Sequence, residues 1–313
     1  MGVRSYVLAL DGGGSKTDAV ALAGPDADAD AGTVLARARR GGSSPQVLGL
    51  EAAVAVVEDV IQDIHEKLPD AVPSRVHASL SGLDLPEETA AFRRAVAGAS
   101  WTPRDPAALV VDNDMFALLR SGTDEPDAVA VVCGTGINAI GVRADGRTVR
   151  FPALGTISGD WGGGWQLGEQ AVWHAARAAD GRGPGTALRD AIPEVFGLAS
   201  LDEVIRALHF GRLTSSRLSA LCPTVFQAAD AGDAIAIGLV DRQAEEVVIL
   251  AATTLRRLEL LGADVPVVLG GGVIAAGDVQ LMDGIRDGMA QRAPHARIVP
   301  VDAPPVVGAA LLA

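Results

Sequence analysis

Short apolar segments, separated by clusters of Gly, Asp and Pro, open the chain and predict β-strands. The segments 6–10, 17–24 and 32–40 are apolar or alternate between apolar and polar positions, as strands do. The breaks between them have the composition of turns. We therefore expect a three-stranded antiparallel meander, although the pattern of the second segment also admits a helix.

The spacing of apolar residues predicts the first helix between Val47 and Leu68. Apolar side chains recur there at steps of three and four residues, which places them on one helical face. They are Val47, Leu50, Val54, Val57, Ile61, Ile64 and Leu68. Pro69 and Pro73 follow directly and end the helix.

Strand and helix patterns then alternate. The segments 75–82 and 108–114 have the pattern of strands. Between them, 85–99 begins with a proline and two glutamates and has the pattern of a helix. The first part of the chain therefore predicts the element order βββαβαβ.

A strand, a glycine-rich turn and a second strand occur twice, at 8–22 and again at 130–142. Asp145-Gly146 adds a further hairpin turn. Because the design is repeated and 313 residues exceed the usual size of one core, we expect two lobes with a cleft between them, related by duplication.

The remainder of the chain predicts mostly helices. After Gly168 the longest is expected at 234–262, where the apolar surface is broad enough for a mostly buried helix. The segment 265–274 is expected to contain the final strand, which ends in three glycines. The fold class predicted from this order is α/β.

Charge and cysteine content exclude several functions. The chain has 26 Lys and Arg against 39 Asp and Glu, so its net charge of -13 opposes binding to nucleic acid or to an anionic membrane. Cys133 and Cys222 are the only cysteines, and they form neither a disulfide framework nor a cysteine-based zinc motif. No apolar segment is long enough for a signal peptide or a membrane span. We expect a cytoplasmic protein.

The first glycine turn, "DGGGSKT", matches neither common nucleotide-binding motif. A Walker loop requires glycine where Ser15 stands, and the Rossmann motif requires glycine at Thr17 and a helix after it. A hairpin turn remains, whose backbone N–H groups can approach a phosphate, helped by the Ser15 and Thr17 hydroxyls and the Lys16 charge. Asp11 would hold Mg²⁺ through water. The alternative is a plain glycine-rich turn.

Two further glycine turns strengthen the phosphate-binding interpretation. The segment 133–136 is suited to a second phosphate, and 269–273 allows backbone to pass close to an adenine or ribose. Each turn alone is weak evidence. Three such turns at strand ends, spread over two lobes, favour a nucleotide site.

Asp112 and Asp160 are the candidate carboxylates for the substrate. Asp112 ends an apolar strand and is our candidate for the base that takes a proton from a substrate hydroxyl. It would otherwise cap the next helix, a role open also to Asn113 or Asp114. Asp160, in "GDWGGGWQLGE", is suited to sugar hydroxyls, with Trp161 as an apolar wall; the alternative is a tight turn with buried tryptophans.

Taken in order, "LDGGGSKT", "LSG", "VVDND", "CGTGIN", "SGDWGGG" and "VVLGGGV" resemble the BadF/BadG-type ATPases, above all their N-acetylglucosamine kinase branch. The resemblance implies two actin-like (ribonuclease H-like) lobes with a nucleotide and sugar cleft between them. It implies an N-terminal lobe of residues 1–115 and a C-terminal lobe of 116–303, with a helix at about 304–313 that returns to the first lobe.

The resemblance also implies a role for each motif. Asp11 would lie on the Mg²⁺ side, and Asp112 would be the catalytic aspartate. The phosphate and adenosine contacts would be Gly13, Gly14, Ser15, Lys16, Thr17, Gly134, Thr135, Gly136, Gly270, Gly271 and Gly272. The residues near the sugar would be Ser44, Ser81, Gly82, Asn138, Asp160 and Trp161.

Three positions depart from the family pattern. Ser44 stands where these kinases have a sugar-binding Asn, Trp161 replaces an acidic residue, and Ile137 replaces a Ser in the second phosphate turn. A hydroxyl reaches less far than an amide, and Trp removes a charge. These changes leave phosphoryl transfer intact but leave the identity of the sugar open.

The resemblance implies an ATP- and Mg²⁺-dependent kinase, a homodimer, that converts N-acetylglucosamine to its 6-phosphate. Kinases for other sugars remain an alternative. An ATPase activator of a CoA-ester dehydratase would need thiolates for an iron–sulfur cluster, which Cys133 and Cys222 support poorly. A sugar sensor would be expected to lack the catalytic aspartate, and the ROK class of sugar kinases carries a zinc motif that this sequence lacks.

Overall fold

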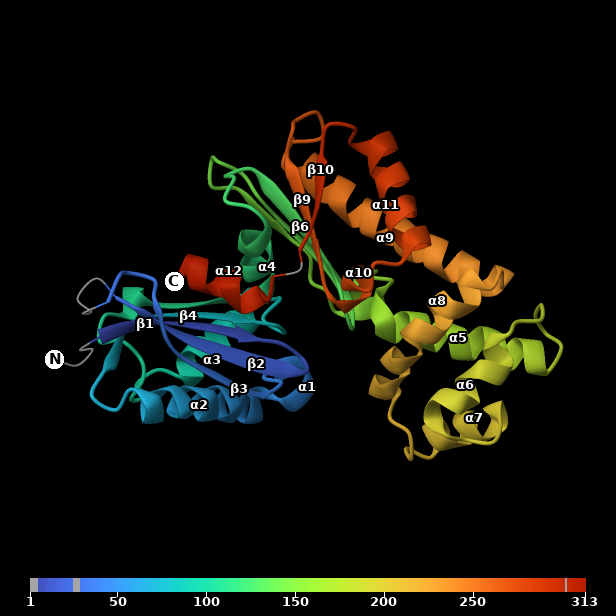
Figure 1. The fold of residues 1–313 in the computed structure, drawn as a ribbon, viewed down its shortest axis with the longest axis horizontal. Helices are drawn as coiled ribbons and strands as arrows, with labels where there is room; N and C mark the ends of the chain where they lie inside the picture. Colours follow the sequence, from blue (N-terminus) through green and yellow to red (C-terminus); the bar gives the residue numbers. More distant parts are fainter. Residues whose placement is uncertain (1–4, 25–28, 302) are drawn as a thin grey trace. The chain divides into compact units, whose positions relative to one another are not determined.

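The structure, a computed structural model, describes residues 5–24, 29–301 and 303–313 (Figure 1). The chain forms two compact units. The first unit comprises Met1–Glu125, Arg150–Pro152 and Asp302–Ala313, and the second comprises Pro126–Val149 and Ala153–Val301. The first boundary thus falls ten residues later than the sequence suggested, because the helix that begins at Asp114 packs on the first sheet and on the C-terminal helix.

The first unit contains a five-stranded sheet in the order β3-β2-β1-β4-β5. Its strands are β1 (Ser5–Gly12), β2 (Lys16–Ala23), β3 (Val34–Gly41), β4 (Val72–Leu80) and β5 (Leu109–Asn113). The pairs β1–β2 and β2–β3 are antiparallel, which confirms the predicted meander and excludes a helix for its second segment. The pairs β1–β4 and β4–β5 are parallel, so these three strands end at one edge of the sheet.

Helices cover both faces of this sheet. They are α1 (Pro45–Leu48), α2 (Leu50–Lys67), α3 (Pro86–Ala95), α4 (Asp114–Gly122) and α12 (Pro305–Leu312), with a 3-10 turn η1 (Pro106–Ala108). Leu8 and Leu10 pack with the buried face of α2, whereas Ala9, between them, packs with α4 and α12. The helix predicted from Val47 is interrupted, because Gly49 has a φ of 83° and separates α1 from α2.

The second unit repeats the strand order of the first, in β10-β9-β6-β7-β8. Its strands are β6 (Ala128–Cys133), β7 (Ile137–Val142), β8 (Thr148–Arg150), β9 (Pro266–Gly270) and β10 (Arg297–Pro300). As in the first sheet, the opening pair β6–β7 is antiparallel, and β6–β9 and β9–β10 are parallel. The predicted repeat is therefore confirmed at the level of strand order. The prediction that 265–274 holds the last strand is wrong, because the four-residue β10 was too short to recognise.

The rest of the second unit is mainly helical, as predicted. Its helices are α5 (Gly163–Ala179), α6 (Leu188–Phe196), α7 (Leu201–His209), α8 (Cys222–Asp230), α9 (Ala234–Arg257), α10 (Gly272–Ala275) and α11 (Val279–Arg292), with 3-10 turns η2 (Gly155–Ser158) and η3 (Ser215–Leu221). α9 is the long, largely buried helix, and it packs on β6, β7 and α11. It ends five residues earlier than predicted, since Glu259 takes a left-handed φ of 61°.

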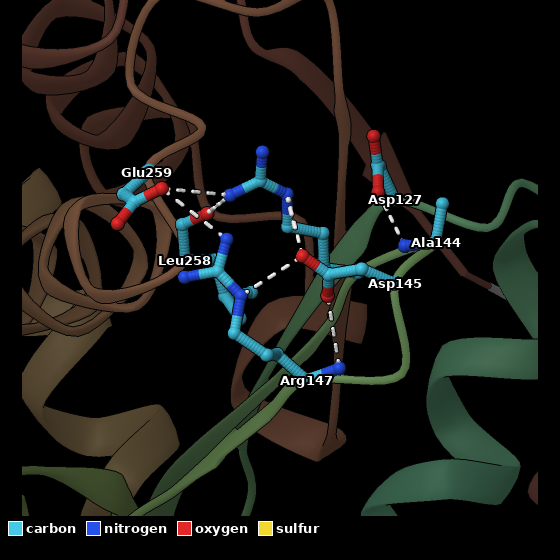
Figure 2. Close-up of polar contacts among 7 residues, drawn as sticks. Asp127, Ala144, Asp145, Arg147, Leu258 and Glu259 are labelled. Atoms are coloured by element: carbon cyan, nitrogen blue, oxygen red, sulfur yellow. Dashed lines mark hydrogen bonds and ion pairs between the residues drawn. The ribbon is translucent and has the colours of Figure 1, made fainter.

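The predicted hairpin turn at Asp145-Gly146 is present, and it is fastened to the end of α9 (Figure 2). The Asp145 carboxylate accepts a hydrogen bond from the Arg147 backbone N–H at 3.0 Å. Arg143 and Arg147 each donate to a Glu259 carboxylate oxygen, at 3.0 and 3.2 Å. These groups lie on the surface, where ion pairs add little to stability. No helix in the described part of the chain is long and apolar enough to cross a membrane.

Candidate functional site

The first glycine turn joins β1 to β2 as a hairpin, as the sequence predicted. The Gly13 N–H donates to the Lys16 carbonyl oxygen at 2.8 Å, which closes the turn. Gly14 and Ser15 are exposed at its tip, and Lys16 is half-buried. The turn therefore presents backbone and one hydroxyl to solvent.

The segment that follows β3 supports this turn by close packing. A Cβ atom at Gly42 would lie 2.3 Å from the Gly14 carbonyl oxygen, so only glycine fits there. The fully buried Thr17 hydroxyl donates to the Gly41 carbonyl oxygen at 2.8 Å and lies 2.8 Å from Ser43 Oγ. The Thr17 hydroxyl thus braces the turn from within, which differs from the exposed phosphate donor expected from the sequence.

Asp11 lies just before the turn and is buried, with 7% of its surface exposed. Its pKa is raised to about 7, mainly by burial and then by the neighbouring Asp18, while Lys16 lowers it. Asp18, directly opposite in the β1–β2 register, is instead paired with Arg39 through two hydrogen bonds. When Asp11 is ionised, the neighbouring groups therefore do not compensate its negative charge.

Asp112 lies near the end of β5, on the sheet edge where β1 and β4 also end. Its Oδ1 atom accepts a hydrogen bond from the Asn113 N–H at 2.8 Å, and Arg150 Nη1 lies 3.6 Å from the same atom. Burial raises the pKa of Asp112, while the Asn113 amide and Arg150 lower it. Asn113 caps α4 by accepting from the Met115 N–H at 3.1 Å, so Asp112 is not the helix cap.

Two further carboxylates at this edge were not singled out from the sequence as site residues. Asp84 accepts hydrogen bonds at 3.0 Å from both Asn113 Nδ2 and Gln46 Nε2, and burial raises its pKa to about 6. The pKa of Asp114 is raised to about 7, mainly by burial and then by the charges of Asp11 and Asp84. The available signal was that Asp114, in "VVDND", directly follows one strand of a parallel pair and that Asp84, in "LSGLD", lies a short turn beyond the other.

The predicted sugar residues of the first unit lie together beside the first turn. The Ser81 N–H donates to the Gly12 carbonyl oxygen at 2.7 Å. Gly82 has a φ of 74°, and a Cβ atom there would lie 2.6 Å from Ser44 Oγ. Ser44 is buried, and Ser81 Oγ is a buried hydroxyl without a hydrogen-bond partner among the described residues. Such a hydroxyl is suited to a ligand that supplies the missing partner.

In the second unit, the turn between β6 and β7 is held by the first turn of α5. The Gly164 N–H donates to the Gly134 carbonyl oxygen at 2.8 Å, and the Trp165 N–H donates to that of Thr135 at 3.0 Å. A Cβ atom at Gly163, whose φ is 83°, would lie 2.5 Å from Gly136 Cα. The glycines 162–164, which directly follow the sugar candidates Asp160 and Trp161, therefore support the second glycine turn.

The third glycine turn packs on the second. Gly271 has a φ of 96°, and a Cβ atom there would lie 2.4 Å from the Cys133 carbonyl oxygen. The predicted phosphate and adenosine turns of this unit, 134–136 and 270–272, are thus brought together. Gln243, which the sequence did not single out, adds a buried support, because its Oε1 accepts from the Gly163 N–H at 2.8 Å.

The predicted sugar residues of the second unit are held by local contacts. Asp160 Oδ2 accepts hydrogen bonds from Ser158 Oγ and from the Gly155 N–H, within the turn η2. Asn138 lies on β7, where its Oδ1 accepts from the Ala139 N–H at 2.7 Å. Trp161 is buried, with the Arg242 guanidinium 4.1 Å above its ring, as the buried-tryptophan alternative predicts.

The two cysteines favour the neutral thiol. Burial raises the pKa of Cys133 to about 12 and that of Cys222 to about 11. Among the residues that the structure describes, no group of three or more His, Cys, Asp or Glu side chains is placed to hold a metal ion. A metal at this protein would thus need ligands beyond the side chains, such as water or phosphate.

Two α/β units with the same strand order are the architecture of actin-like sugar kinases. A ROK family glucokinase from Streptomyces griseus superposes with a TM-score of 0.53 over 98% of this chain and 99% of its own, at 17% identity, which shows the fold alone. A putative N-acetylglucosamine kinase from Chromobacterium violaceum gives a TM-score of 0.74, with 26% identity and 99% of both chains covered. The predicted fold class is confirmed.

The sequence model of the BadF/BadG/BcrA/BcrD ATPase family matches residues 8–313, and the chain belongs to this family. An N-acetyl-D-glucosamine kinase of Dictyostelium discoideum is 26% identical over 99% of this chain and 98% of its own length. An N-acetylmuramic acid/N-acetylglucosamine kinase of Clostridium acetobutylicum is 25% identical over 86% and 85%. The family resemblance found in the motifs is therefore confirmed.

Proposed function

We propose that this protein is an ATP-dependent kinase that transfers a phosphoryl group to a hydroxyl of an amino sugar, most specifically to O6 of N-acetylglucosamine. The observation that carries the proposal is the place of Asp112. It lies at a strand end, half-buried, in a family whose similar members are named N-acetylglucosamine kinases over nearly their full length. A carboxylate so placed is suited to accept the proton of an attacking hydroxyl.

The proposed reaction gives each glycine turn a role. Backbone N–H groups and Lys16 in the first turn, with those of 134–136 in the second, bind the phosphates, and 270–272 lie along the adenosine. Ser44, Ser81, Gly82, Asn138 and Asp160 hold the sugar hydroxyls. Asp112 takes the hydroxyl proton as the new oxygen–phosphorus bond forms and the bond to ADP breaks. Trp161 is buried against the Arg242 guanidinium, and we assign it no contact with the sugar.

The residues around Asp11 fit a magnesium ion bound together with ATP. Asp11 is buried, its pKa is raised, and the described residues offer its carboxylate no hydrogen bond. A cation beside it would stabilise the ionised form, and Mg²⁺ commonly uses only one or two carboxylates besides water and phosphate oxygens. Bound there, the ion would offset the negative charge of the transferring phosphoryl group.

Two predictions from the sequence remain open beside this proposal. The departures at Ser44, Ile137 and Trp161 make a different amino sugar the principal alternative. The Clostridium acetobutylicum relative, named for two sugars, supports testing N-acetylmuramic acid as well. The expected homodimer would be tested by sedimentation equilibrium of the purified protein.

Coupled ADP release from the purified protein with MgATP tests the proposal. The acceptors are N-acetylglucosamine, N-acetylmuramic acid, glucosamine, N-acetylmannosamine and glucose, and NMR locates the phosphate on the product. We expect the highest kcat/KM with N-acetylglucosamine and phosphate on O6. Absence of turnover with every sugar would overturn the assignment as a sugar kinase, and a different preferred sugar would overturn only its specificity.

Asp112→Asn tests the role of the candidate base. The amide keeps the size of the side chain but accepts no proton, so kcat should fall by a factor of about 10²–10⁴ while ATP binding stays close to that of the unmodified protein. Asp70→Asn, at an exposed position, is the matched control and should leave kcat unchanged. Near-normal turnover of Asp112→Asn would remove Asp112 from the reaction.

A further inference from the structure

Arg150 ends β8, and three contacts within the first unit hold its guanidinium. Nη2 donates to the Leu83 carbonyl oxygen at 2.7 Å, and Nη1 lies 3.6 Å from Asp112 Oδ1. The guanidinium also lies 5.8 Å from the centre of the Phe116 ring. Together with Phe151 and Pro152, Arg150 forms the short segment of chain that belongs to the first unit while its sequence neighbours belong to the second.

The two carboxylate oxygens of Asp112 differ in the partners that they have. Oδ1 has two partners, because the Asn113 N–H donates to it at 2.8 Å and Arg150 approaches the same atom. Oδ2 has no hydrogen-bond partner among the residues that the structure describes. One oxygen is therefore held in place, and the other is left to accept a proton.

The charges around Asp112 show why a cation is needed there. Burial raises the pKa of Asp112, and Arg150 lowers it. On the adjoining elements, Asp84, Glu88 and Asp114 are acidic, and Arg150 also lowers the pKa of Asp84. Because Arg150 is the charged side chain that favours the ionised form of Asp112, its loss would leave a half-buried carboxylate that more readily takes up a proton from solvent.

We propose that Arg150 is a positioning residue for the reaction: it holds Oδ1 of Asp112 so that Oδ2 accepts the proton of the substrate hydroxyl. This inference rests on the proposed kinase function. In the step, the hydroxyl proton passes to Oδ2, the hydroxyl oxygen bonds to the γ-phosphorus, and the electron pair of the broken P–O bond leaves with ADP. Arg150 contacts neither substrate and acts through Asp112.

The first test compares Arg150→Ala and Arg150→Lys with Arg104→Ala, a matched removal of an exposed arginine in the same unit. For Arg150→Ala we expect kcat near pH 7 to fall about tenfold, KM for ATP to change less than twofold, and the acidic limb of the pH profile to move to higher pH. Arg150→Lys should lose less kcat than Arg150→Ala, since lysine keeps the positive charge but lacks the planar guanidinium group with its several N–H donors. Free guanidinium ion, added to the Arg150→Ala variant, should restore part of the lost kcat.

A purely structural role would give a different pattern. In that case Arg150→Ala would lower the unfolding midpoint and kcat together, without moving the acidic limb, and guanidinium would restore nothing. Equal losses in Arg150→Ala and Arg104→Ala would also overturn the proposal, because the effect would then belong to net charge.

A second measurement separates this inference from the proposed function. NMR titration of the Asp112 carboxyl carbon in the protein without substrates should give a higher pKa in Arg150→Ala than in the unmodified protein. Equal values would overturn the positioning role even if the enzyme phosphorylates sugars. A higher value in a protein that phosphorylates no sugar would keep the Arg150–Asp112 coupling and reject the kinase assignment.

Discussion

The two units share a strand order but carry different chemistry at the same places in their sheets. In the first, the second residue pair from the hairpin turn is Asp11 and Asp18. In the second, the corresponding pair is Val132 and Asn138. The strand next to this hairpin is followed by Ser81-Gly82 in the first sheet, and in the second it leads into the glycines 270–272. The same strand order thus places charged side chains at this end of the sheet in one unit and mainly glycine backbone at the same end in the other.

The difference follows from what each edge has to hold in place. The first unit keeps several carboxylates buried and close together, and burial first, then the neighbouring charges, raise the pKa values of Asp11, Asp84 and Asp114. Such crowding costs stability and persists where the charges are used. The second unit holds its turns by glycine contacts too close for any side chain. We therefore expect substitutions of these carboxylates to act on function and substitutions of these glycines to act on folding.

The largest effect should come from Gly163→Ala in the second unit. The added Cβ would lie 2.5 Å from Gly136 Cα, at a φ of 83° that side chains disfavour. Since backbone must move on both sides, we expect the free energy of unfolding to fall by about 3 kcal/mol or more. Urea unfolding followed by tryptophan fluorescence would measure it, because Trp161, Trp165 and Trp173 lie in this unit.

Gly136→Ala is the matched control, because a Cβ atom there meets nothing within 4 Å. It should change the unfolding midpoint little. If Gly136→Ala proved as destabilising as Gly163→Ala, close packing would not be the reason for glycine in this turn.

In the first unit, Asp11→Asn should make the protein more stable and less active. At pH 8, without metal, removing the uncompensated charge should raise the free energy of unfolding by about 2 kcal/mol. A carboxyl whose folded pKa is raised to about 7 is protonated in the folded protein at pH 5 but still ionised in the unfolded chain, so the gain should be smaller at pH 5 and vanish only below the ordinary pKa of aspartate, about 4. Activity with MgATP should be lost at both pH values. Chemical unfolding in EDTA at the two pH values measures the gain, and an unchanged or lower stability at pH 8 contradicts it.

His77 gives an effect of opposite sign in the same unit. It is buried on β4, and neither ring nitrogen has a hydrogen-bond partner in the described part of the chain. Burial lowers its pKa to about 4, so the unfolded chain binds a proton below pH 6.5 that the folded protein excludes. Stability should therefore fall as the pH drops from 6.5 towards 4, by about 1–2 kcal/mol through this residue.

His77→Leu should remove that part of the acid sensitivity. Subtracting the unfolding free energies of variant and unmodified protein at each pH cancels the carboxylates, whose raised pKa values act in the opposite direction. A difference that stays constant from pH 7 to pH 4.5 would show that His77 is not excluded from protonation.

The sequence predicted the parts of this arrangement that are local. Turns at 12–16 and 134–136 and the strands beside them follow from glycine and apolar patterns, and they appear as expected. What failed depended on contacts between distant segments. Thr17 turns inward because Gly41 offers its hydroxyl a partner, and Gly163 serves the second turn because α5 meets it there. No local pattern distinguishes a glycine that touches a ligand from one that touches backbone.

The carboxylates show the same limit. Asp112 was recognisable because it ends an apolar strand, but Asp84 lies beyond a glycine turn and reaches the same edge only through the β4–β5 pairing. Arg150 gave no signal at all, since its partner is 38 positions away and on another element. Contacts between residues so far apart in the sequence can be identified only from the folded structure.

The smallest effect should come from the surface charges of the second unit, which test whether its ionic contacts serve structure alone. Arg147 and Arg143 hydrogen-bond Glu259 and lower its pKa (Figure 2). Glu259→Gln should lower the unfolding midpoint slightly at low salt and near pH 7, and the difference should vanish at 1 M salt or below the Glu259 pKa. Its kcat should match that of the unmodified protein. A lowered kcat with an unchanged midpoint would mean that charge contributes to function in both units, and the contrast between them would fail.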